Sequence, residues 1–394
     1  MPTSTAALIG ELPAVEGGSP VFEARFRFIQ PTLPSLDRVL AHYHSAYAEG
    51  LITNSDLVAR LEAAAAARLG VNHIIAVSSC TSGLIMVLRA LGLSGEVILP
   101  SFTFFATGHA VLWNGLRPVF ADCDRQTWTI DPVDVERKIT ERTSAILAVH
   151  LYGNPCDIEA LASIASRHRL KLIFDAAHAF GSQYGGRPIG QFGDAEVFSL
   201  SPTKLLVAGE GGLVATNDRT LARLIRAARN YGDLGAYDCE VLGLNARMSE
   251  FHAALALAGL EMVDAKVRRH NEIAANYTAL LASVRGLSFQ TVSPHHTCAY
   301  KDYSVLVDHE SCGLSRDQLA QALLAENIET KKYFYPPLHK QKLYAEYYDT
   351  ERDGLSLTNR ISGGILSLPI YESMPETTVE RIAFAIQRIL KSPR

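Results

Sequence analysis

The sequence predicts an α/β fold, with a mostly parallel central sheet in a large domain and a smaller α/β domain at the C-terminus. Short β-rich runs alternate with longer helical stretches through the first half of the chain, as expected of βαβ units around a buried parallel sheet. A long helical region follows, and the alternation then resumes on a smaller scale. The 394 residues, 48% of them hydrophobic, are enough to form more than one core.

The elements of the large domain follow from local patterns. Residues 1–28 are rich in Pro, Gly and small side chains and are expected to form a loose, flexible arm. DLVARLEAAAAARLG, residues 56–70, is a strong helix pattern. Short apolar runs of strand type then follow, namely HIIAVS, GEVILP, RPVFA, SAILAV, KLIF, AEVFSL and GGLVAT.

The C-terminal part of the chain begins with a helical pattern. Apolar residues recur at spacings of three and four from Met248 to Leu281, which predicts one long connecting helix. The segments after it read as strand, helix, strand and terminal helix, in the order YSVLVD, SRDQLAQALLAEN, IETKKYF and PETTVERIAFAIQRIL. We therefore expect a large domain over residues 29–265 and a small domain over residues 266–394.

Composition excludes several classes of protein. The net charge of -4 and the lack of a basic stripe argue against general nucleic-acid binding. The cysteines form no CxxC pair and no His/Cys cluster, so we expect reduced thiols, no disulfide framework and no metal. The N-terminus lacks a signal-peptide pattern and no run is long enough to span a membrane. These features favour a cytoplasmic protein.

Two side chains follow expected strands and suggest a cofactor. Asp175 comes directly after KLIF, and Lys204 ends SLSPTK, shortly before the glycine run GEGG. Pyridoxal phosphate (PLP) requires a lysine amine that holds its aldehyde as a Schiff base, and a carboxylate opposite its ring nitrogen. Open α/β sheets bind ligands at strand ends. We therefore predict a PLP site, against the alternatives of a surface lysine and a helix-capping aspartate.

Small polar residues supply the third requirement, a phosphate site. VSSCTSGL follows an expected strand and opens a helix, so Thr81 and Ser82 can offer backbone N–H groups and hydroxyls to the phosphate. Ser199 is expected to add a hydroxyl from the opposite side. Helix N-capping is the alternative for the first pair and is compatible with phosphate binding. The glycines of GEGG lack both nucleotide-binding patterns, GxGxxG and GxxxxGK[ST].

The ordered set of motifs resembles the sugar aminotransferases of the DegT/DnrJ/EryC1/StrS family, PLP enzymes of fold type I. It covers nearly the whole chain, through GLITNSDLVARLE, VSSCTSGL, PSFTFFAT, DAAHAFG, SLSPTK, GEGGLVATND, GLNARMSE and KKYFYPPLHKQ. The resemblance implies a homodimer with shared active sites. It also implies amino transfer from L-glutamate or L-glutamine to a keto sugar attached to a nucleoside diphosphate.

Two other activities and one noncatalytic function stay open at this point. Cyclitol ketones are alternative amino acceptors within the same family. A PLP-dependent sugar dehydratase has the same fold but carries histidine in place of the lysine, so Lys204 argues against it. A noncatalytic regulator with a PLP fold would have no use for Lys204, Asp175 and Ser199 together.

The resemblance also implies roles for individual residues. Lys204 would hold the cofactor and move the reacting proton, and Asp175 would face the ring nitrogen. His178 matches a position that approaches the ring oxygen, although a lone histidine is often structural. Phe104 matches the aromatic residue that stacks on the ring, with neighbouring phenylalanines as alternatives.

The remaining implied contacts involve the partner subunit and the substrate. Asn245, in GLNARMS, matches an asparagine that reaches the cofactor phosphate of the neighbouring subunit, and capping of the following helix is the alternative. Substrate contacts are implied for Thr53, Asn54, Lys331, Tyr333 and His339.

Overall fold

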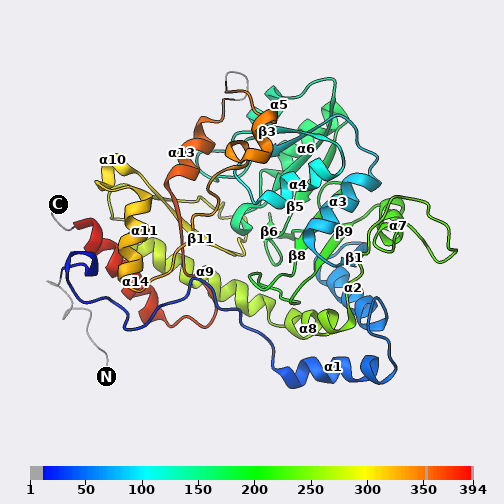
Figure 1. The fold of residues 1–394 in the computed structure, drawn as a ribbon, viewed down its shortest axis with the longest axis horizontal. Helices are drawn as coiled ribbons and strands as arrows, with labels where there is room; N and C mark the ends of the chain where they lie inside the picture. The colour runs from blue at the N-terminus through cyan, green and yellow to red at the C-terminus, as the bar shows by residue number, and fades with distance from the viewer. Residues whose placement is uncertain (1–11, 351–353, 392–394) are drawn as a thin grey trace.

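The structure, a computed structural model, describes residues 12–350 and 354–391. Within them, seven strands form a sheet in the order β1-β9-β8-β5-β4-β2-β3, and helices cover both faces (Figure 1). The predicted α/β class is confirmed. Each strand expected in this part of the chain is present: β1 (His73–Val77), β2 (Glu96–Pro100), β3 (Arg117–Ala121), β4 (Thr143–Val149), β5 (Lys171–Asp175), β8 (Ala195–Ser199) and β9 (Gly212–Thr216).

The sheet is mostly parallel, as predicted. β3, β2, β4, β5 and β8 run parallel to one another, whereas β9 pairs antiparallel with both β8 and β1. Because β5 and β8 are parallel neighbours, Asp175 and Ser199, their last residues, lie at the same edge of the sheet. A separate hairpin is formed by β6 (Gln183–Tyr184) and β7 (Arg187–Pro188).

Alternate residues of the strands face two different cores. In β1, Ile74 and Ala76 belong to one core, and Ile75 and Val77 belong to the other. The first core includes α2, α6 and α8, and the second includes α3, α4 and α7. The helices of this part are α1 (Leu36–Ala48), α2 (Asp56–Leu69), α3 (Cys80–Ala90), α4 (Phe105–Trp113), α5 (Pro132–Arg137), α6 (Ile158–His168), α7 (Arg219–Ala228) and α8 (Glu250–Leu260).

A second, smaller α/β unit follows the long helix α9 (Val263–Leu281). Its antiparallel sheet has the order β10-β11-β12, and α9, α11 and α14 pack on it (Figure 1). The expected strand YSVLVD and the two expected helices of this unit are confirmed. The elements are β10 (Leu287–Phe289), β11 (Tyr303–Val307), α10 (His309–Cys312), α11 (Arg316–Ala325), α13 (Ser356–Gly364), β12 (Ile365–Leu368) and α14 (Glu376–Lys391).

The single helix predicted from Met248 to Leu281 is wrong, because the chain forms two helices there. α8 ends at Leu260 and α9 begins at Val263. The interruption follows Gly259, a residue type that weakens helices, and the N–H of Met262 bonds back to the Gly259 carbonyl at 3.0 Å. The apolar period continues across the break, which is why the sequence pattern did not reveal it.

The strand predicted for IETKKYF is also wrong. This segment makes only isolated bridges, Ile328 with Phe26 and Lys331 with Ser367. Two consecutive prolines, Pro336 and Pro337, follow it and have no N–H groups for a sheet. The chain continues instead through two short 3-10 helices, η4 (Leu338–Lys340) and η5 (Lys342–Tyr347).

The N-terminal segment packs against the small unit, in contrast to the loose arm predicted for residues 1–28. Residues 1–11 lie outside the described residues, but Val21 and Phe22 belong to the core of the small unit. The N–H groups of Ala14 and Val21 both donate to the buried Glu326 carboxylate at 2.9 Å. Apolar side chains and hydrogen bonds to Glu326 together anchor this Gly- and Pro-rich segment. A short 3-10 helix, η2 (Ala14–Glu16), lies within this segment.

The division into residues 29–265 and 266–394 stays a proposal. α9 supplies Val263 and Val267 to the core of the large unit, and Tyr277 and Leu281 to the core of the small one. One continuous helix therefore serves both cores.

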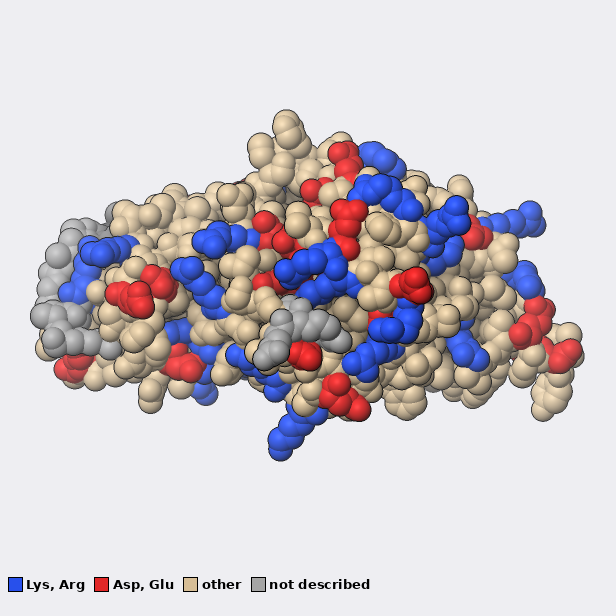
Figure 2. All heavy atoms as spheres, turned by 90° about the horizontal axis from the view of Figure 1, so that it is seen from above, with Lys and Arg blue, Asp and Glu red and all other residues tan. Residues whose placement is uncertain are grey.

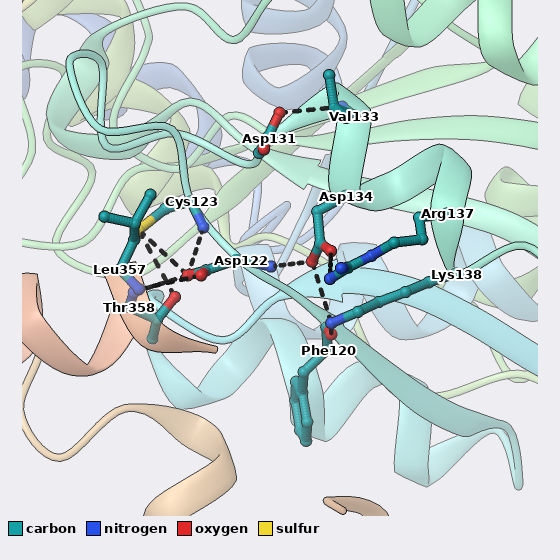
Figure 3. A network of polar contacts seen from close by, with 10 residues as sticks. All are labelled: Phe120, Asp122, Cys123, Asp131, Val133, Asp134, Arg137, Lys138, Leu357 and Thr358. Carbon is teal, nitrogen blue, oxygen red and sulfur yellow. Dashed lines mark hydrogen bonds and ion pairs between the residues drawn. The ribbon is translucent and has the colours of Figure 1, made fainter. Parts of the chain in front are cut away.

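A buried carboxylate joins the large unit to α13 (Figure 3). Asp122, just after β3, accepts hydrogen bonds from the N–H groups of Leu357 (3.0 Å) and Thr358 (2.6 Å) in the first turn of α13. Its own N–H donates to Asp134, which is also paired with Lys138. Negative charge at a helix N-terminus is favourable, so Asp122 holds α13 against the large sheet.

The surface carries both signs of charge. Figure 2 shows Lys and Arg side chains interspersed with Asp and Glu over the face that is seen from above. Among the described residues, no helix is long and apolar enough to cross a membrane.

Candidate active site

A cavity of about 370 Å³ opens at the edge of the sheet where β5 and β8 end. It brings together seven of the residues singled out in the sequence: Thr81, Phe104, Asp175, His178, Ser199, Lys204 and Tyr333. Strand ends and the loops just after them carry most of these residues, since side chains at the ends of parallel strands converge at one edge. The volume lies in the range of small-molecule sites.

Asp175 is a buried carboxylate held by neutral donors. Its Oδ2 accepts a hydrogen bond from the Thr107 hydroxyl at 2.8 Å, and its Oδ1 accepts one from the Ala177 N–H at 3.1 Å. Burial raises the pKa of Asp175, and these two hydrogen bonds oppose the rise. No cation forms an ion pair with Asp175 within the described residues.

Lys204 lies on the wall of the same cavity. Its backbone N–H bonds to the Ser201 carbonyl at 3.0 Å, which holds the turn after β8. Burial lowers the pKa of its amine to about 8, and the neighbouring Lys301 ammonium acts in the same direction. A substantial fraction of an amine with such a pKa is neutral near pH 8, and a neutral amine is a nucleophile and a base.

His178 is fixed in one tautomer. Its Nδ1 accepts a hydrogen bond from the N–H of Tyr152 at 3.1 Å, so a neutral ring carries its proton on Nε2. Burial holds the pKa of His178 well below its usual value, and the two lysines Lys204 and Lys301 lower it further. The ring lines the cavity and stacks near Phe334. The lowered pKa favours a neutral ring, whose Nε2–H is then available as a donor on the cavity wall.

Hydroxyl groups form another part of the wall. Ser79, Thr81, Ser199 and Ser201 line the cavity, and the Ser199 hydroxyl lies 3.3 Å from that of Ser201. Ser82 does not line it. Its hydroxyl closes a capping box with Ser79 at the start of α3, accepting from the Ser79 N–H at 3.1 Å and donating to the Ser79 carbonyl at 2.8 Å.

Phe104 is the phenylalanine that lines the cavity. It is 43% exposed, whereas Phe102 is buried in the core. Phe105 packs against Phe104 and lines a neighbouring cavity of about 560 Å³ together with Lys331 and Tyr333. Phe104 and Tyr333 border both cavities, so the two are adjacent.

Besides Ser82, four predicted residues lie outside both cavities of this single chain. The Thr53 hydroxyl and the Asn54 N–H both donate to the Met248 carbonyl, just before α8. Asn245 is exposed and lies three residues before Met248. Ser249, rather than Asn245, caps α8. His339 is buried, and its Nδ1 lies 2.7 Å from the Ser101 hydroxyl.

Sequence reasoning assigned no site role to Cys80 and Lys301, which line the cavity, or to Thr107, which contacts Asp175. Thr107 lies behind Asp175, Cys80 lies beside it with its Sγ 3.9 Å from Oδ1, and Lys301 comes from the small unit. Burial raises the pKa of the Cys80 thiol well above its usual value, and the nearby Asp175 carboxylate adds to this. The signal for Thr107 is its place as the last residue of PSFTFFAT, four residues after Thr103, whose hydroxyl lies 2.9 Å from its own. Lys301 has no local signal.

The donor set fits PLP. The Asp175 carboxylate is hydrogen-bonded only to neutral groups, so it can pair with a protonated ring nitrogen. The Lys204 amine has a lowered pKa, so it can react with an aldehyde. The hydroxyl cluster beside the N-terminus of α3 suits a phosphate, because a helix N-terminus attracts anions. The aromatic ring of Phe104 offers a flat surface for a pyridine.

The fold and the cavity define an α/β enzyme with a lysine and a buried carboxylate at the ends of parallel strands. A sequence profile described as the DegT/DnrJ/EryC1/StrS aminotransferase family matches residues 37–387. The chain belongs to this family of aminotransferases.

Individual relatives support the assignment. The chain is 33% identical over 355 residues to dTDP-4-amino-4,6-dideoxy-D-glucose transaminase of Escherichia coli, covering 90% of this chain and 95% of that protein. It is 36% identical to an Acidithiobacillus ferrooxidans protein named UDP-N-acetyl-3-dehydro-alpha-D-glucosamine 3-aminotransferase, covering 84% and 88%. The crystal structure of DesI in the presence of its TDP-sugar product superposes with a TM-score of 0.89 at 36% identity, covering 95% of each chain.

Proposed function

We propose that this aminotransferase uses PLP to move an amino group from L-glutamate or L-glutamine to a keto sugar linked to a nucleoside diphosphate. The observation that carries the proposal is the convergence of Lys204 and Asp175 in one cavity with a hydroxyl cluster. The names of the two curated relatives, both sugar-nucleotide aminotransferases, support the choice of acceptor. The products would be the 2-keto acid and the amino sugar.

Each part of the cavity has a distinct task in this proposal. Lys204 would bind the cofactor aldehyde, and Asp175 would pair with the ring nitrogen. Ser199, Thr81 and the first turn of α3 would hold the phosphate, with Ser82 acting through the loop it caps. Phe104 would cover the ring. When bound, PLP supplies an electron sink for the carbon that loses its proton.

The chain's own residues would control proton movement. The Lys204 amine, with its pKa lowered to about 8 by burial, can accept a proton from the substrate carbon and return it nearby. The Nε2–H of His178 can donate to an oxygen in the cavity, because Tyr152 fixes the opposite nitrogen as an acceptor. Tyr333 and Phe334 restrict access of water on one side.

The neighbouring cavity suits the sugar nucleotide. It presents the exposed rings of Phe105 and Tyr335 and the amine of Lys331, a combination that can contact a base and a phosphate. Thr53, Asn54 and His339 would act from outside both cavities of a single chain.

A homodimer with shared sites is part of the proposal. Asn245 is exposed and would reach the phosphate of the neighbouring subunit. The loop before it carries exposed apolar side chains, with Tyr237 100%, Leu242 71% and Leu244 39% accessible. Exposed apolar residues gathered on one loop are typical of a protein interface. We also propose a cytoplasmic location, supported by six unpaired cysteines.

The test is to run the two half-reactions separately. L-glutamate or L-glutamine alone should convert the PLP form to the pyridoxamine phosphate form and release one 2-keto acid per site. The keto sugar that corresponds to dTDP-4-amino-4,6-dideoxy-D-glucose should then restore the PLP form and gain nitrogen, with ping-pong kinetics.

Three controls separate the alternatives. A cyclitol ketone is tested as acceptor in parallel. If the enzyme prefers it to every keto-sugar nucleotide, the proposed acceptor is wrong and the cyclitol ketone takes its place. Loss of a sugar hydroxyl without gain of nitrogen would identify a dehydratase. Protein that takes up no PLP would contradict the proposal altogether.

A further inference from the structure

A second lysine, Lys301, lines the cavity beside Lys204 and has no role in the function proposed above. It precedes β11 in the small unit, and its N–H donates to the Tyr152 carbonyl at 2.8 Å. This bond brings a residue of the small unit to the cavity of the large one. The side chain is only 5% exposed, so an ammonium group is held out of bulk water at the site.

The Lys301 ammonium is paired but has donors to spare. Its Nζ donates to Asp302 Oδ1 at 2.7 Å, and it lies 5.2 Å from the centre of the Tyr333 ring. An ammonium group has three N–H donors, and within the described residues no further hydrogen bond uses them. Buried donors without partners are costly, so a site of this kind favours a ligand with acceptor oxygens.

The other groups on the wall leave Lys301 as the cation for an anionic substrate group. Lys204 is committed to the cofactor, and His178 is neutral. Lys301 lines the same cavity as Lys204 and His178, and its like charge contributes to the lowered pKa of both. In an amino acid the α-carboxylate is bonded to the carbon that carries the reacting amine.

We propose that Lys301 binds the α-carboxylate of the amino donor and thereby selects amino acids in the first half-reaction. This inference rests on the proposed function. L-glutamate and L-glutamine share the α-carboxylate, so it does not depend on which of them is the donor. The keto sugar has no such group, and the second half-reaction should therefore depend little on Lys301.

The decisive experiment compares two amines in two proteins. L-glutamate carries an α-carboxylate, and isoglutamine has a neutral α-carboxamide in its place. The measured quantity is the apparent second-order rate constant of the first half-reaction under single-turnover conditions. For the wild-type enzyme, this constant should be about 10- to 100-fold larger for L-glutamate, which corresponds to the free energy of one hydrogen bond between charged groups. Lys301→Met should abolish this preference. If the Lys301→Met substitution also changes the reactivity of Lys204, both amines are affected equally. That change therefore cancels in the ratio of their rate constants.

Two further variants guard against a folding defect. Lys301→Met with Asp302→Asn removes both charges, so no unpaired carboxylate stays buried, and should show the same loss of preference. Lys171→Met breaks a Lys–Asp pair far from the cavity, with Asp194, and should leave the preference unchanged. An unchanged preference in both Lys301 variants would overturn the inference, as would an equal loss in the half-reaction with the keto sugar.

A binding measurement separates this inference from the proposed function. Calorimetry with 2-oxoglutarate should give a Kd about 10- to 100-fold higher for Lys301→Met than for the wild-type enzyme. If no amine produces pyridoxamine phosphate but this difference is found, the proposed function fails and the carboxylate site stands. If turnover is normal and the Kd values are equal, the carboxylate site fails and the function stands.

Discussion

The pKa values of Lys204 and Asp175 shift in opposite directions in the same cavity. Burial lowers the pKa of the Lys204 amine to about 8 and raises the pKa of the Asp175 carboxyl group. Loss of hydration disfavours the charged form of either group, so both shifts have one cause. Thr107 and the Ala177 N–H counteract the shift for Asp175 by donating to its oxygens.

The lowered pKa of Lys204 predicts the pH dependence of cofactor capture. Only the neutral amine attacks an aldehyde, so capture should rise about tenfold per pH unit below pH 8 and level off above it. The measurement is mass spectrometry of the Lys204 peptide after brief exposure of apoenzyme to PLP and borohydride. Lys301→Met should move the midpoint to higher pH, because it removes a like charge. A midpoint near pH 10 in the wild-type enzyme would contradict the role given to burial.

Removal of the Asp175 carboxylate should abolish most activity without unfolding the protein. Asp175→Ala should lower kcat by about two orders of magnitude, as is typical when one preorganised electrostatic group is removed. In the proposed function, this carboxylate keeps the ring nitrogen of PLP protonated. Steady-state kinetics measure the loss, and circular dichroism checks the fold. Glu376→Ala, which removes a carboxylate that is 78% exposed, is the control and should have normal kcat. Equal kcat values for the two variants would remove Asp175 from its proposed role.

Local motifs predicted the site residues that lie at or beside strand ends. They did not reveal residues that distant segments of the chain bring to the cavity. Lys204, Asp175 and Thr81 each sit beside a recognisable strand, which is why the sequence placed them at one edge of the sheet. Lys301 reaches the cavity through a tertiary contact with Tyr152. A contact between distant segments leaves no periodic signal in one sequence.

The elements show the same distinction between local and distant information. The seven strands of the large sheet are apolar runs of local origin, and all were predicted. The break between α8 and α9 follows Gly259, and the irregular path of residues 328–334 precedes Pro336 and Pro337, but the apolar patterns around them masked both signals. The anchoring of residues 13–28 depends on Glu326 and the small core, far along the sequence.

Glu326 should be essential to the stability of the small unit. Its carboxylate is fully buried, accepts two N–H groups of the N-terminal segment and pairs with Arg388 at 2.6 Å. Glu326→Gln should lower the free energy of unfolding by about 3–5 kcal/mol, the usual result of removing one partner of a buried ion pair. Glu240→Gln, which breaks an exposed pair with Arg223, should cost about 0.5 kcal/mol or less.

The free energies of unfolding of Glu326→Gln and Glu240→Gln are measured by urea denaturation followed by circular dichroism. A loss below about 1 kcal/mol for Glu326→Gln would show that the N-terminal segment is held by its apolar side chains alone.

At the scale of the whole molecule, the proposed dimer predicts complementation between two inactive variants. If Asn245 serves the neighbouring subunit, a hybrid of Lys204→Ala and Asn245→Ala protomers has one site with both residues intact. Equal mixing after subunit exchange should give about a quarter of the wild-type activity, since half of the dimers are hybrids with one good site.

The complementation assay requires proof of exchange, for which differently tagged protomers are copurified. Activity no higher than that of the separate variants, despite shown exchange, would contradict the shared site. The control mixes Lys204→Ala with Asp175→Ala, two residues of the same cavity, and should not restore activity.

The contact between residues 13–28 and the end of the chain also sets an order of events during synthesis. Val21 leaves the ribosome 305 residues before Glu326, its hydrogen-bond partner, and still earlier than Arg388. Until then Val21 and Phe22 have no core to enter and stay open to other proteins. This segment can therefore dock only long after it is made, and a chain that stalls before residue 326 exposes it to chaperones and proteases.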